Sequence, residues 1–495
     1  MYGWNNVLLR VNLAEGTVRK EVIPHELLQD YAGQFTLAAR CWARLNETAA
    51  PEEDRIVMMT GPMTGMMGEG VNRYALAYRG RDGFCVDSCG GRFGAELKLA
   101  GYDGVIVEGR AETPVYLCIR DGAVQLRDAS AAWGQNVDDT VRTLTAACAP
   151  GAGTLCIGQA AEQQCAFAAA VGDRLYLSPG GFGTVMGAMK LKGVVVRGSG
   201  TISVADPEAY LECALESRRR VSEDPFAVCL GSNTFQVTAD VLRNLQARPY
   251  AGYRHAVRQI DWRESAACTT VVRRACYSCT VGCRKCVRIT DGALVRTLET
   301  PAPEMAEVFE RACGVTALEA QLEAFELCRQ YGMDPAACSS AVGLVMRLAD
   351  AGLLSSYGEE GGTFGSPEAM VRLVSLIGQQ QGVGALAARG VRAMAGQLNA
   401  AEAAAQVCAA VEGRYGVASV AALRKNSKEE EQQLALLAFA QDCGICPYAA
   451  VAYTEYLLCR TLRAALGHAP EAGEIGRLGA AVRQIMENQT KGAES

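Results

Sequence analysis

Three features are missing from this chain of 495 residues, and each absence excludes a class of protein. No run reaches the ~18 apolar residues that a membrane-spanning helix needs. Residues 1–6 lack the basic and apolar segments with which an export signal begins. The net charge is −6, which gives no electrostatic support to a general nucleic-acid role. We therefore expect a cytoplasmic protein, without a membrane span or a nucleic-acid partner, whose cysteines are reduced.

Histidine is also scarce, with three residues, whereas cysteine is abundant, with 21. Four cysteines follow the spacing C-x2-C-x3-C-x2-C: Cys276, Cys279, Cys283 and Cys286. A zinc ribbon needs two CxxC pairs about 15–20 residues apart, and here only three residues separate the pairs. The run instead resembles iron–sulfur ligation, in which three cysteines of one loop hold a [4Fe–4S] cubane and a fourth comes from elsewhere. Zinc and a loop without metal are the alternatives.

Three cysteines are candidates for the fourth ligand. Cys446 is preferred because Pro447 follows it, and ferredoxin-type runs often finish in Cys-Pro. Cys286, at the end of the run, is the alternative, and Cys443 is a weaker third choice.

Basic residues surround the cysteine run, in contrast to the negative charge of the whole chain: Arg273, Arg274, Arg284, Lys285 and Arg288. They form either a solvated loop or a positive rim that steers an acidic electron carrier towards the cluster. The second interpretation predicts that replacing Arg284 and Lys285 by glutamate slows the reduction of an acidic ferredoxin.

The first part of the chain, to about residue 205, is rich in strands and glycine. Five segments are predicted as hairpins or strands: 7–22, 55–60, 104–109, 115–127 and 193–196. After residue 206 helical periodicity dominates, for example at 316–331 and 366–398, and the segment 400–490 is rich in alanine.

Several separated motifs stand in order along the chain: residues 2–4, 61–65, 73–74, 90–103, 128–134 and 180–187, followed by the cysteine run. Together they resemble the tungsten/molybdenum aldehyde:ferredoxin oxidoreductase family. The segment 90–103, which reads GGRFGAELKLAGYD, is the most specific match. The resemblance is good over 1–205 and around 260–310, and thin beyond 335.

The resemblance implies an α+β fold in three parts: a β-rich pterin-binding N-terminal domain (1–205), a helical middle domain with the cysteine loop (206–400) and a shortened helical C-terminal domain with the remote cysteine (401–495). It implies two-electron oxidation of an aldehyde, or the reverse, at a tungsten- or molybdenum-bis-pterin centre. Electrons would leave through the [4Fe–4S] cluster, held by Cys276, Cys279, Cys283 and Cys446, to ferredoxin or a ferredoxin-like subunit. A homodimer or a hetero-complex is compatible with the family.

In this family the pterin sulfurs hold the metal, so the protein supplies arginine and backbone N–H groups that bind anions. The resemblance places these contacts at Arg73, in the turn Ser88-Cys89-Gly90 and in the loop Gly180-Gly181. Taken alone, each of these loops is also readable as a tight turn.

Two further cofactor motifs, of the form Asp-x-x-Gly-Leu-Asp/Cys, are altered. In the first, Arg329 replaces the leading aspartate and Asp334 is retained. In the second, Gln441 leads, Gly444 is retained and Cys446 ends the motif. Since arginine only donates hydrogen bonds where aspartate accepts them, Arg329 would meet a phosphate of a different or differently placed cofactor.

The catalytic groups of the family are replaced or missing. Ala306 stands where the family has a glutamate beside the metal, and Glu304 and Glu307 are the candidate substitutes. The histidine-bearing segment has no counterpart among His25, His255 and His468. Three hypotheses follow: a divergent redox enzyme of this family, an electron-transfer or scaffold subunit that has lost aldehyde oxidation, and a zinc-binding structural protein.

Overall fold

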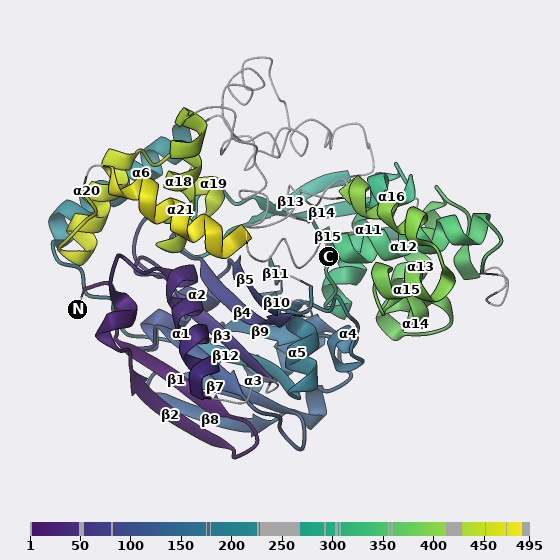
Figure 1. Cartoon of the computed structure of the whole chain (residues 1–495), viewed down its shortest axis with the longest axis horizontal. Helices are drawn as coiled ribbons and strands as arrows, with labels where there is room; N and C mark the ends of the chain where they lie inside the picture. Colours follow the sequence, from purple (N-terminus) through teal and green to yellow (C-terminus); the bar gives the residue numbers. More distant parts are fainter. Residues whose placement is uncertain are drawn as a thin grey trace.

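The computed structural model describes residues 2–48, 54–80, 83–174, 176–178, 180–224, 227, 268–291, 294–301, 305, 308–354, 357, 360–411, 428–450, 452–471 and 473–487. In these ranges, none of the helices has the length and apolar character needed to cross a membrane. A sheet-rich N-terminal part carries two separate groups of helices, and a small sheet lies between the groups (Figure 1). The predicted α+β class is confirmed.

Twelve strands build two sheets in the N-terminal part. They are β1 (Val7–Asn12), β2 (Thr17–Val22), β3 (Arg55–Thr60), β4 (Tyr74–Gly80), β5 (Gly83–Cys89), β6 (Gly104–Glu108), β7 (Val115–Arg120), β8 (Ala123–Asp128), β9 (Gly153–Ile157), β10 (Ala170–Gly172), β11 (Tyr176–Leu177) and β12 (Leu191–Arg197). The strand orders are β2-β1-β6-β3-β4-β5 and β11-β10-β9-β12-β7-β8. The pairs β1·β6 and β7·β12 are parallel, and the other pairs are antiparallel.

All five predicted strand or hairpin segments are confirmed, whereas β4, β5, β9, β10 and β11 were missed. The strand β9 lacks the alternation that marks a half-buried strand. All five of its residues are buried, so its sequence shows no alternation between apolar and polar positions.

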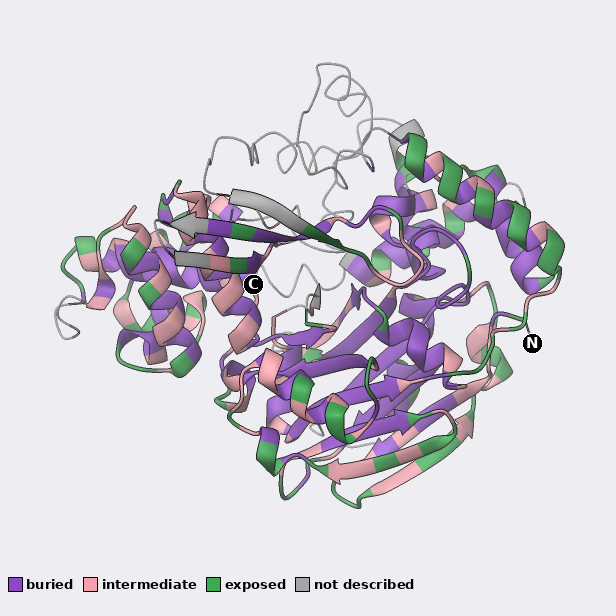
Figure 2. Cartoon of the chain, turned by 180° about the vertical axis from the view of Figure 1, so that it is seen from behind, coloured by how far each residue is buried: buried purple, intermediate pink, exposed green. Residues whose placement is uncertain are grey.

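The strand β3 shows how the layers pack, because all six of its residues are buried. On one face, Val57 and Met59 pack in the core formed with α1 (Gln34–Thr48). On the other face, Ile56 and Met58 join a larger core that also includes Leu117 of the second sheet. The sheets are therefore largely buried between helices and each other, and the outer strands β2 and β8 have few buried residues (Figure 2).

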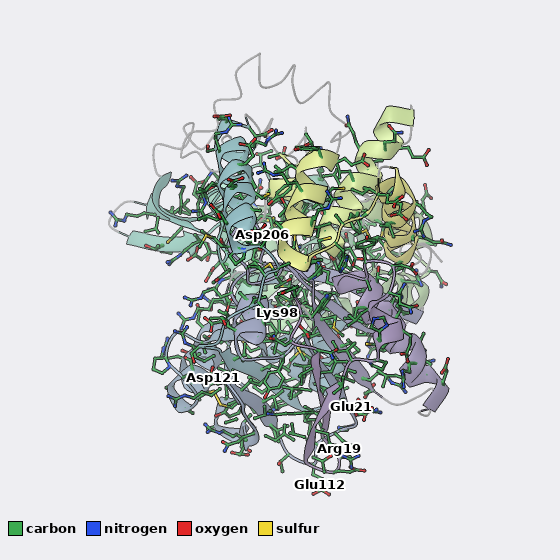
Figure 3. All side chains as sticks on the ribbon, turned by 90° about the vertical axis from the view of Figure 1, so that its left-hand side faces the viewer. Arg19, Glu21, Lys98, Glu112, Asp121 and Asp206 are labelled. Carbon is green, nitrogen blue, oxygen red and sulfur yellow. A yellow bond between two sulfur atoms is a disulfide. The ribbon has the colours of Figure 1, made fainter. Side chains whose placement is uncertain are left out.

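The segment 90–103, which carries the most specific motif, has a structural role. It includes α2 (Phe93–Leu99). The ammonium group of Lys98 is buried and donates to Asp103 Oδ1 at 2.7 Å and to the carbonyl of Gly3 at 2.6 Å (Figure 3). It also lies 4.2 Å from the ring centre of Trp4. Asp103 accepts further bonds from the backbone N–H groups of residues 5–7. The motif therefore anchors the N-terminal segment to the first sheet.

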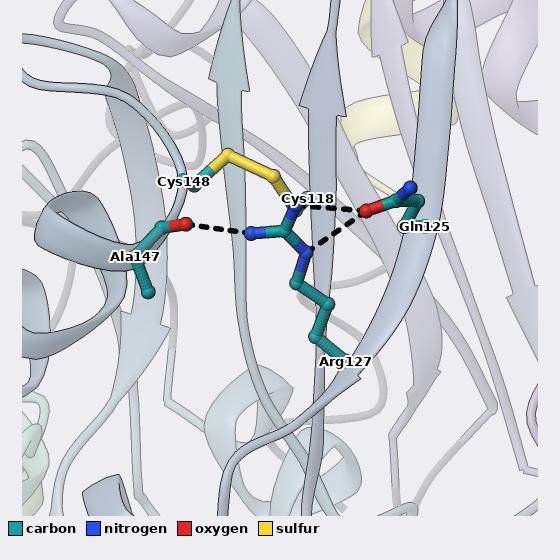
Figure 4. The surroundings of a disulfide bond; sticks show 5 residues. All are labelled: Cys118, Gln125, Arg127, Ala147 and Cys148. Atoms are coloured by element: carbon teal, nitrogen blue, oxygen red, sulfur yellow. Dashed lines mark hydrogen bonds between the residues drawn. A yellow bond between two sulfur atoms is a disulfide. The ribbon is translucent and has the colours of Figure 1, made fainter.

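The expectation that the cysteines are reduced is wrong for one pair. Cys118 of β7 forms a disulfide with Cys148, which follows α3 (Val137–Ala147) (Figure 4). Arg127 spans the same region, donating to the carbonyl of Ala147 at 2.6 Å and to the side-chain oxygen of Gln125. Thirty residues separate the two cysteines, and nothing in their local sequence distinguishes them from the others.

The helices beyond the sheets form two groups (Figure 1). The first contains α10 (Val308–Cys313), α11 (Leu318–Tyr331), α12 (Pro335–Asp350), α13 (Pro367–Gln379), α14 (Val383–Ala387), α15 (Val391–Leu398) and α16 (Ala401–Val411). The second contains α6 (Pro207–Glu223), α18 (Lys428–Asp442), α19 (Pro447–Ala450), α20 (Glu455–Leu466) and α21 (Glu474–Glu487).

The packing of two helices bears on the predicted boundaries at residues 206 and 400, which stay a prediction. Helix α6, predicted to lie in the middle domain, packs against α20 at the C-terminal end of the chain. Helix α16, predicted to lie in the C-terminal domain, packs against α10 and α12. Periodicity reveals that a helix has an apolar face, but it does not identify the helix on which that face packs.

A third sheet joins the two groups of helices. It has the order β13 (Cys268–Arg274), β14 (Arg284–Asp291) and β15 (Leu294–Glu299), and all its pairs are antiparallel. The expectation that helices dominate after residue 206 missed these strands. The β13–β14 connection, residues 275–283, contains three of the four clustered cysteines and is called the cluster loop below.

Candidate metal centre and cofactor site

One glycine joins the two cysteine segments that the sequence separates. The N–H of Gly70 donates to the carbonyl of Ser278 in the cluster loop at 3.1 Å, and its carbonyl accepts from the N–H of Cys446 at 2.8 Å. Its φ is +71°, and a Cβ here would lie 2.5 Å from the Cβ of Ala449 and 3.2 Å from that of Cys446. Only glycine fits this position. Through its two hydrogen bonds, Gly70 holds the remote Cys446 next to the cluster loop.

Further hydrogen bonds fasten the cluster loop to the connection between β3 and β4. The hydroxyl of Ser278 donates to the carbonyl of Gly68 at 2.7 Å. The side-chain amide of Asn72 donates to the carbonyl of Tyr277 at 3.0 Å, and the N–H of Tyr277 donates to Gly91 at 3.1 Å. The position of the cysteines is therefore set by the N-terminal domain as well as by the sheet β13–β15.

The segment 441–446 docks on the other side of the same connection. Ile445 forms an isolated antiparallel bridge with Val71, and the N–H of Arg73 donates to the carbonyl of Gly444 at 3.0 Å. Asp442 accepts from three backbone N–H groups at the start of α1 and from the hydroxyl of Thr36 at 2.6 Å. Burial raises the pKa of this carboxyl, and the four hydrogen bonds oppose the rise.

The thiols of the cluster loop and Cys446 lie within electrostatic range of one another. Burial raises the pKa of Cys279, and the neighbouring Cys276 and Cys446 raise it further. Burial raises the pKa of Cys446 to about 11, although Arg73 lowers it. Cys283 packs against the same group of buried residues as Cys446. These four are the cysteines predicted to hold the cluster.

The other two candidates for the fourth ligand have different neighbours. Cys286 lies within β14, where burial and Glu299 raise the pKa of its thiol. Burial, Asp442 and Cys459 raise the pKa of Cys443. Cys446 is the candidate whose backbone is joined to the cluster loop through Gly70, so the geometry favours Cys446.

The described residues contain no group of three or more His, Cys, Asp and Glu side chains that converge to hold one metal ion. A zinc site needs its ligands around one point. The ligands of a cubane are instead spread around a cube of iron and sulfide, so they lie farther from one another than the ligands of one ion.

Arg73 and the turn predicted to contact the cofactor come together. The Arg73 guanidinium donates to the hydroxyl of Ser88 at 2.7 and 3.0 Å and to its carbonyl at 2.7 Å. Burial acts to lower the pKa of Arg73, but the thiols of Cys446, Cys89 and Cys276 raise it above its usual value. Burial raises the pKa of Cys89 to about 11. A half-buried cation therefore lies between the cluster cysteines and the predicted cofactor turn, in which Gly90 is buried.

The second glycine loop and Asp334 also come together. The N–H of Gly180 donates to Asp334 at 3.2 Å, and the hydroxyl of Tyr78 donates to the carbonyl of Gly180 at 2.8 Å. Asp334 also accepts from two N–H groups in the first turn of α12. The φ of Gly181 is +99°, which favours glycine.

The segment before Asp334 docks in the same manner as the segment 441–446. Met333 forms an isolated antiparallel bridge with Ala168, as Ile445 does with Val71. Each of the two altered motifs therefore docks by one antiparallel bridge, the first on the connection before β10 and the second on the connection between β3 and β4.

Arg329 is fully occupied by protein acceptors. It donates to both carboxylate oxygens of Asp138 at 2.9 and 2.7 Å, to both oxygens of Glu326 and to the carbonyl of Arg174 at 3.0 Å. These bonds use its five N–H donors, so a cofactor phosphate would have to displace one of them. The residue joins α11 to α3 across two domains.

Two buried acceptors, one next to Arg73 in the chain and one in the segment 441–446 to which Arg73 is bonded, have no hydrogen-bond partner among the described residues. They are the side-chain oxygens of Asn72 and Gln441. Buried polar atoms normally have a partner, and a pterin ring presents N–H donors whereas its phosphate needs a cation. Arg73, Asn72 and Gln441 therefore fit a pterin cofactor at this junction, although Gln441 replaces the aspartate expected there.

Both predicted catalytic residues, Glu304 and Glu307, lie outside the described residues, as does Ala306. Their role stays a prediction.

The predicted basic rim is wrong for two of its members. Arg284 and Lys285 are only 8% and 2% exposed, because the sheet β13–β15 buries them. A charge reversal at these positions would disturb the sheet instead of testing a docking surface. In the strand register, Arg273 of β13 lies directly opposite Lys285 of β14, so both side chains are on the same face of the sheet. Side chains alternate along a strand, so Arg288 lies on the other face. Of the five predicted rim residues, Arg273, Arg274 and Arg288 are exposed.

Sequence reasoning also missed Glu69, which lies between Gly68 and Gly70. It is the only charged residue between Gly61 and Asn72, and it is completely buried. A single carboxylate in an otherwise uncharged glycine loop was the signal that could have identified it.

Comparisons with known proteins show the family to which the chain is related. Two family models match, described as aldehyde ferredoxin oxidoreductase, N-terminal domain (residues 8–198) and domains 2 & 3 (residues 214–418). The tungsten-containing aldehyde ferredoxin oxidoreductase of Pyrococcus horikoshii is 29% identical over 421 residues, which cover 81% of this chain and 68% of that protein. The WOR-like subunit of the aliphatic sulfonate oxidoreductase of Pyrococcus furiosus is 26% identical over 428 residues, covering 79% of this chain and 66% of that protein.

The fold has a counterpart among solved structures. The active site complex BamBC of benzoyl coenzyme A reductase, bound to 1,5-dienoyl-CoA, superposes with a TM-score of 0.79. The match covers 98% of this chain and 88% of that chain at 20% sequence identity. The likeness therefore concerns the fold.

Proposed function

Because the chain belongs to the aldehyde ferredoxin oxidoreductase family of oxidoreductases, we propose that it catalyses two-electron oxidation of an aldehyde to a carboxylate, or the reverse. The proposed cofactors are a tungsten- or molybdenum-bis-pterin and a [4Fe–4S] cluster held by Cys276, Cys279, Cys283 and Cys446. The observation that carries the proposal is the double hydrogen bond of Gly70, which joins Ser278 of the cluster loop to Cys446.

The residues of the junction divide the work. When bound, the metal pterin would supply a two-electron acceptor, and a cluster held by Cys276, Cys279, Cys283 and Cys446 would supply one-electron transfer. Arg73 supplies a half-buried positive charge between the two groups, oriented by its three hydrogen bonds to Ser88. Asn72 and Gln441 offer buried acceptors for the pterin ring. Glu304 and Glu307 are the proposed proton carriers. We also propose a cytoplasmic setting, since the described cysteine side chains outside the Cys118–Cys148 pair form no disulfides.

A second function is an electron-transfer or scaffold subunit that binds the cluster without oxidising aldehydes. The replacement of the family glutamate by Ala306 and the ion pairs of Arg329 favour it. One relative carries the printed description of a WOR-like subunit, which also suits a role within a hetero-complex.

Metal analysis of anaerobically purified protein separates these functions. The enzyme is expected to contain about four iron atoms per chain together with tungsten or molybdenum. Iron without tungsten or molybdenum would instead support the subunit. Zinc alone would contradict both.

The structure also redirects the expected site of ferredoxin docking. Arg273 is exposed, and its Cβ would lie 3.6 Å from a Cβ placed on Gly282 of the cluster loop. We expect Arg273→Glu to slow the reduction of an acidic ferredoxin by about tenfold at low salt, and to flatten the dependence of the rate on salt. Stopped-flow reduction of ferredoxin at several salt concentrations measures both effects.

Arg288→Glu is the matched control, because it makes the same charge change on the opposite face of the sheet. Equal rates of ferredoxin reduction for the two variants would contradict docking of ferredoxin at Arg273.

A further inference from the structure

A buried carboxylate in the N-terminal domain reaches the cluster loop. Glu69 lies in the glycine-rich connection between β3 and β4 and is completely buried. Burying a carboxylate is costly unless hydrogen bonds or a nearby cation compensate it. Its neighbour Gly70 is the residue that joins the cluster loop to Cys446.

The partners of Glu69 lie beside a predicted cluster ligand. Its carboxylate accepts from the N–H of Thr280 at 2.7 Å and from the hydroxyl of Thr280 at 2.9 Å. Thr280 directly follows Cys279 in the chain. On the outer side, the guanidinium of Arg218 lies 3.8 Å away, and this arginine side chain is 44% exposed. Among the described residues, the carboxylate therefore contacts the cluster loop on its inner side and a partly solvated cation on its outer side.

Two physical effects of this arrangement act in the same direction. A negative charge close to an iron–sulfur cluster opposes the addition of an electron, and little water screens a charge that is buried. Hydrogen bonds to cluster sulfurs also tune the potential, but the N–H of Thr280 is used by Glu69. Both effects keep the cluster harder to reduce.

We propose that Glu69 is a positioning residue that fastens the cluster loop to the N-terminal domain and lowers the reduction potential of the cluster. The inference rests on the proposed function, because it requires a [4Fe–4S] cluster at Cys276, Cys279, Cys283 and Cys446. A low potential would suit the transfer of electrons to ferredoxin.

The test is Glu69→Gln, which removes the charge and retains the shape and one acceptor oxygen. At a fixed ambient potential, the ratio of reduced to oxidised cluster is expected to rise about tenfold, which corresponds to ~59 mV for one electron. Anaerobic potentiometric titration, followed by the electron paramagnetic resonance signal of the reduced cluster, measures this shift. Iron content is measured on the same samples.

Two further variants separate charge from position. Thr280→Val removes one hydrogen bond and keeps the carboxylate, so it is expected to move the potential less than Glu69→Gln. Glu112→Gln makes the same charge change at an exposed site on the far side of the N-terminal domain and should leave the potential unchanged (Figure 3).

Arg218→Gln provides a test even if Glu69→Gln loses its iron. It removes the outer cation, so the potential is expected to fall, in the opposite direction and by a smaller amount. An unchanged potential in Glu69→Gln with full iron content, or in Arg218→Gln, would overturn the inference and leave the proposed function intact. A wild-type protein without iron would instead overturn the proposed function.

Discussion

Replacing Cys446 by alanine is expected to reduce the iron content from about four atoms per chain to below about one, with loss of ferredoxin reduction. The thiol is one of the four proposed ligands of the cubane, and its site is buried, so water cannot readily take its place. The backbone bond from Cys446 to Gly70 is unaffected by the change, so the segment 441–446 should stay docked. Iron analysis and the visible absorbance of anaerobic protein provide the measurement.

The chain offers two matched controls for this experiment. Cys443→Ala and Cys286→Ala each remove a buried thiol from a neighbouring position. Both variants should retain their iron, because Cys286 lies within β14 and Cys443 directly follows α18, and neither is one of the four proposed ligands. Full iron in Cys446→Ala together with its loss in Cys286→Ala would assign the fourth ligand to the run itself.

The largest effect on stability is expected from Lys98→Met. Methionine has a similar volume but cannot donate, so the Asp103 carboxylate would stay buried without its cation and the carbonyl of Gly3 would lose its partner. Removing one member of a buried ion pair costs about 3–5 kcal/mol. We expect a value near ~3 kcal/mol, because the backbone N–H groups of residues 5–7 still bind Asp103. Denaturant unfolding followed by tryptophan fluorescence and circular dichroism measures the loss.

Lys20→Met is the matched control. Lys20 is exposed, and its ammonium group donates to the carbonyl of Gly122 at 3.1 Å in contact with solvent. Its replacement should change the free energy of unfolding by less than about 0.5 kcal/mol. If both variants were equally stable, the buried pair would contribute nothing beyond an exposed one.

Local chemistry and periodicity carried much of the prediction. The cysteine spacing marked the cluster loop, alternation and a turn located the hairpins β1–β2 and β7–β8, and short apolar runs located β3, β6 and β12. Burial on both faces removes the alternation, so β9 was missed, although the equally buried β3 and β6 were found from their apolar runs. The β13–β15 sheet was missed within a region whose flanking sequences have helical periodicity.

Motif matching identified residues that matter without revealing what each of them does. Asp334 was predicted to contact a cofactor, and the structure shows that it holds Gly180 and the start of α12. Arg329 was expected to meet a phosphate, but Asp138 and Glu326 occupy it. The basic run appeared uniform, yet pairing in the sheet buries Arg284 and Lys285.

The sequence by itself determined the kinds of groups available: clustered thiols, glycine loops, and strands followed by helices. These depend on residue type and short-range spacing, which are local properties of a chain. Only the tertiary structure decided that Cys446 meets the cluster loop and that Glu69 reaches Thr280. These contacts join segments some 170 to 210 residues apart in the chain. Which residues meet is set by the docking of whole domains, as at Gly70, and no local sequence pattern specifies that docking.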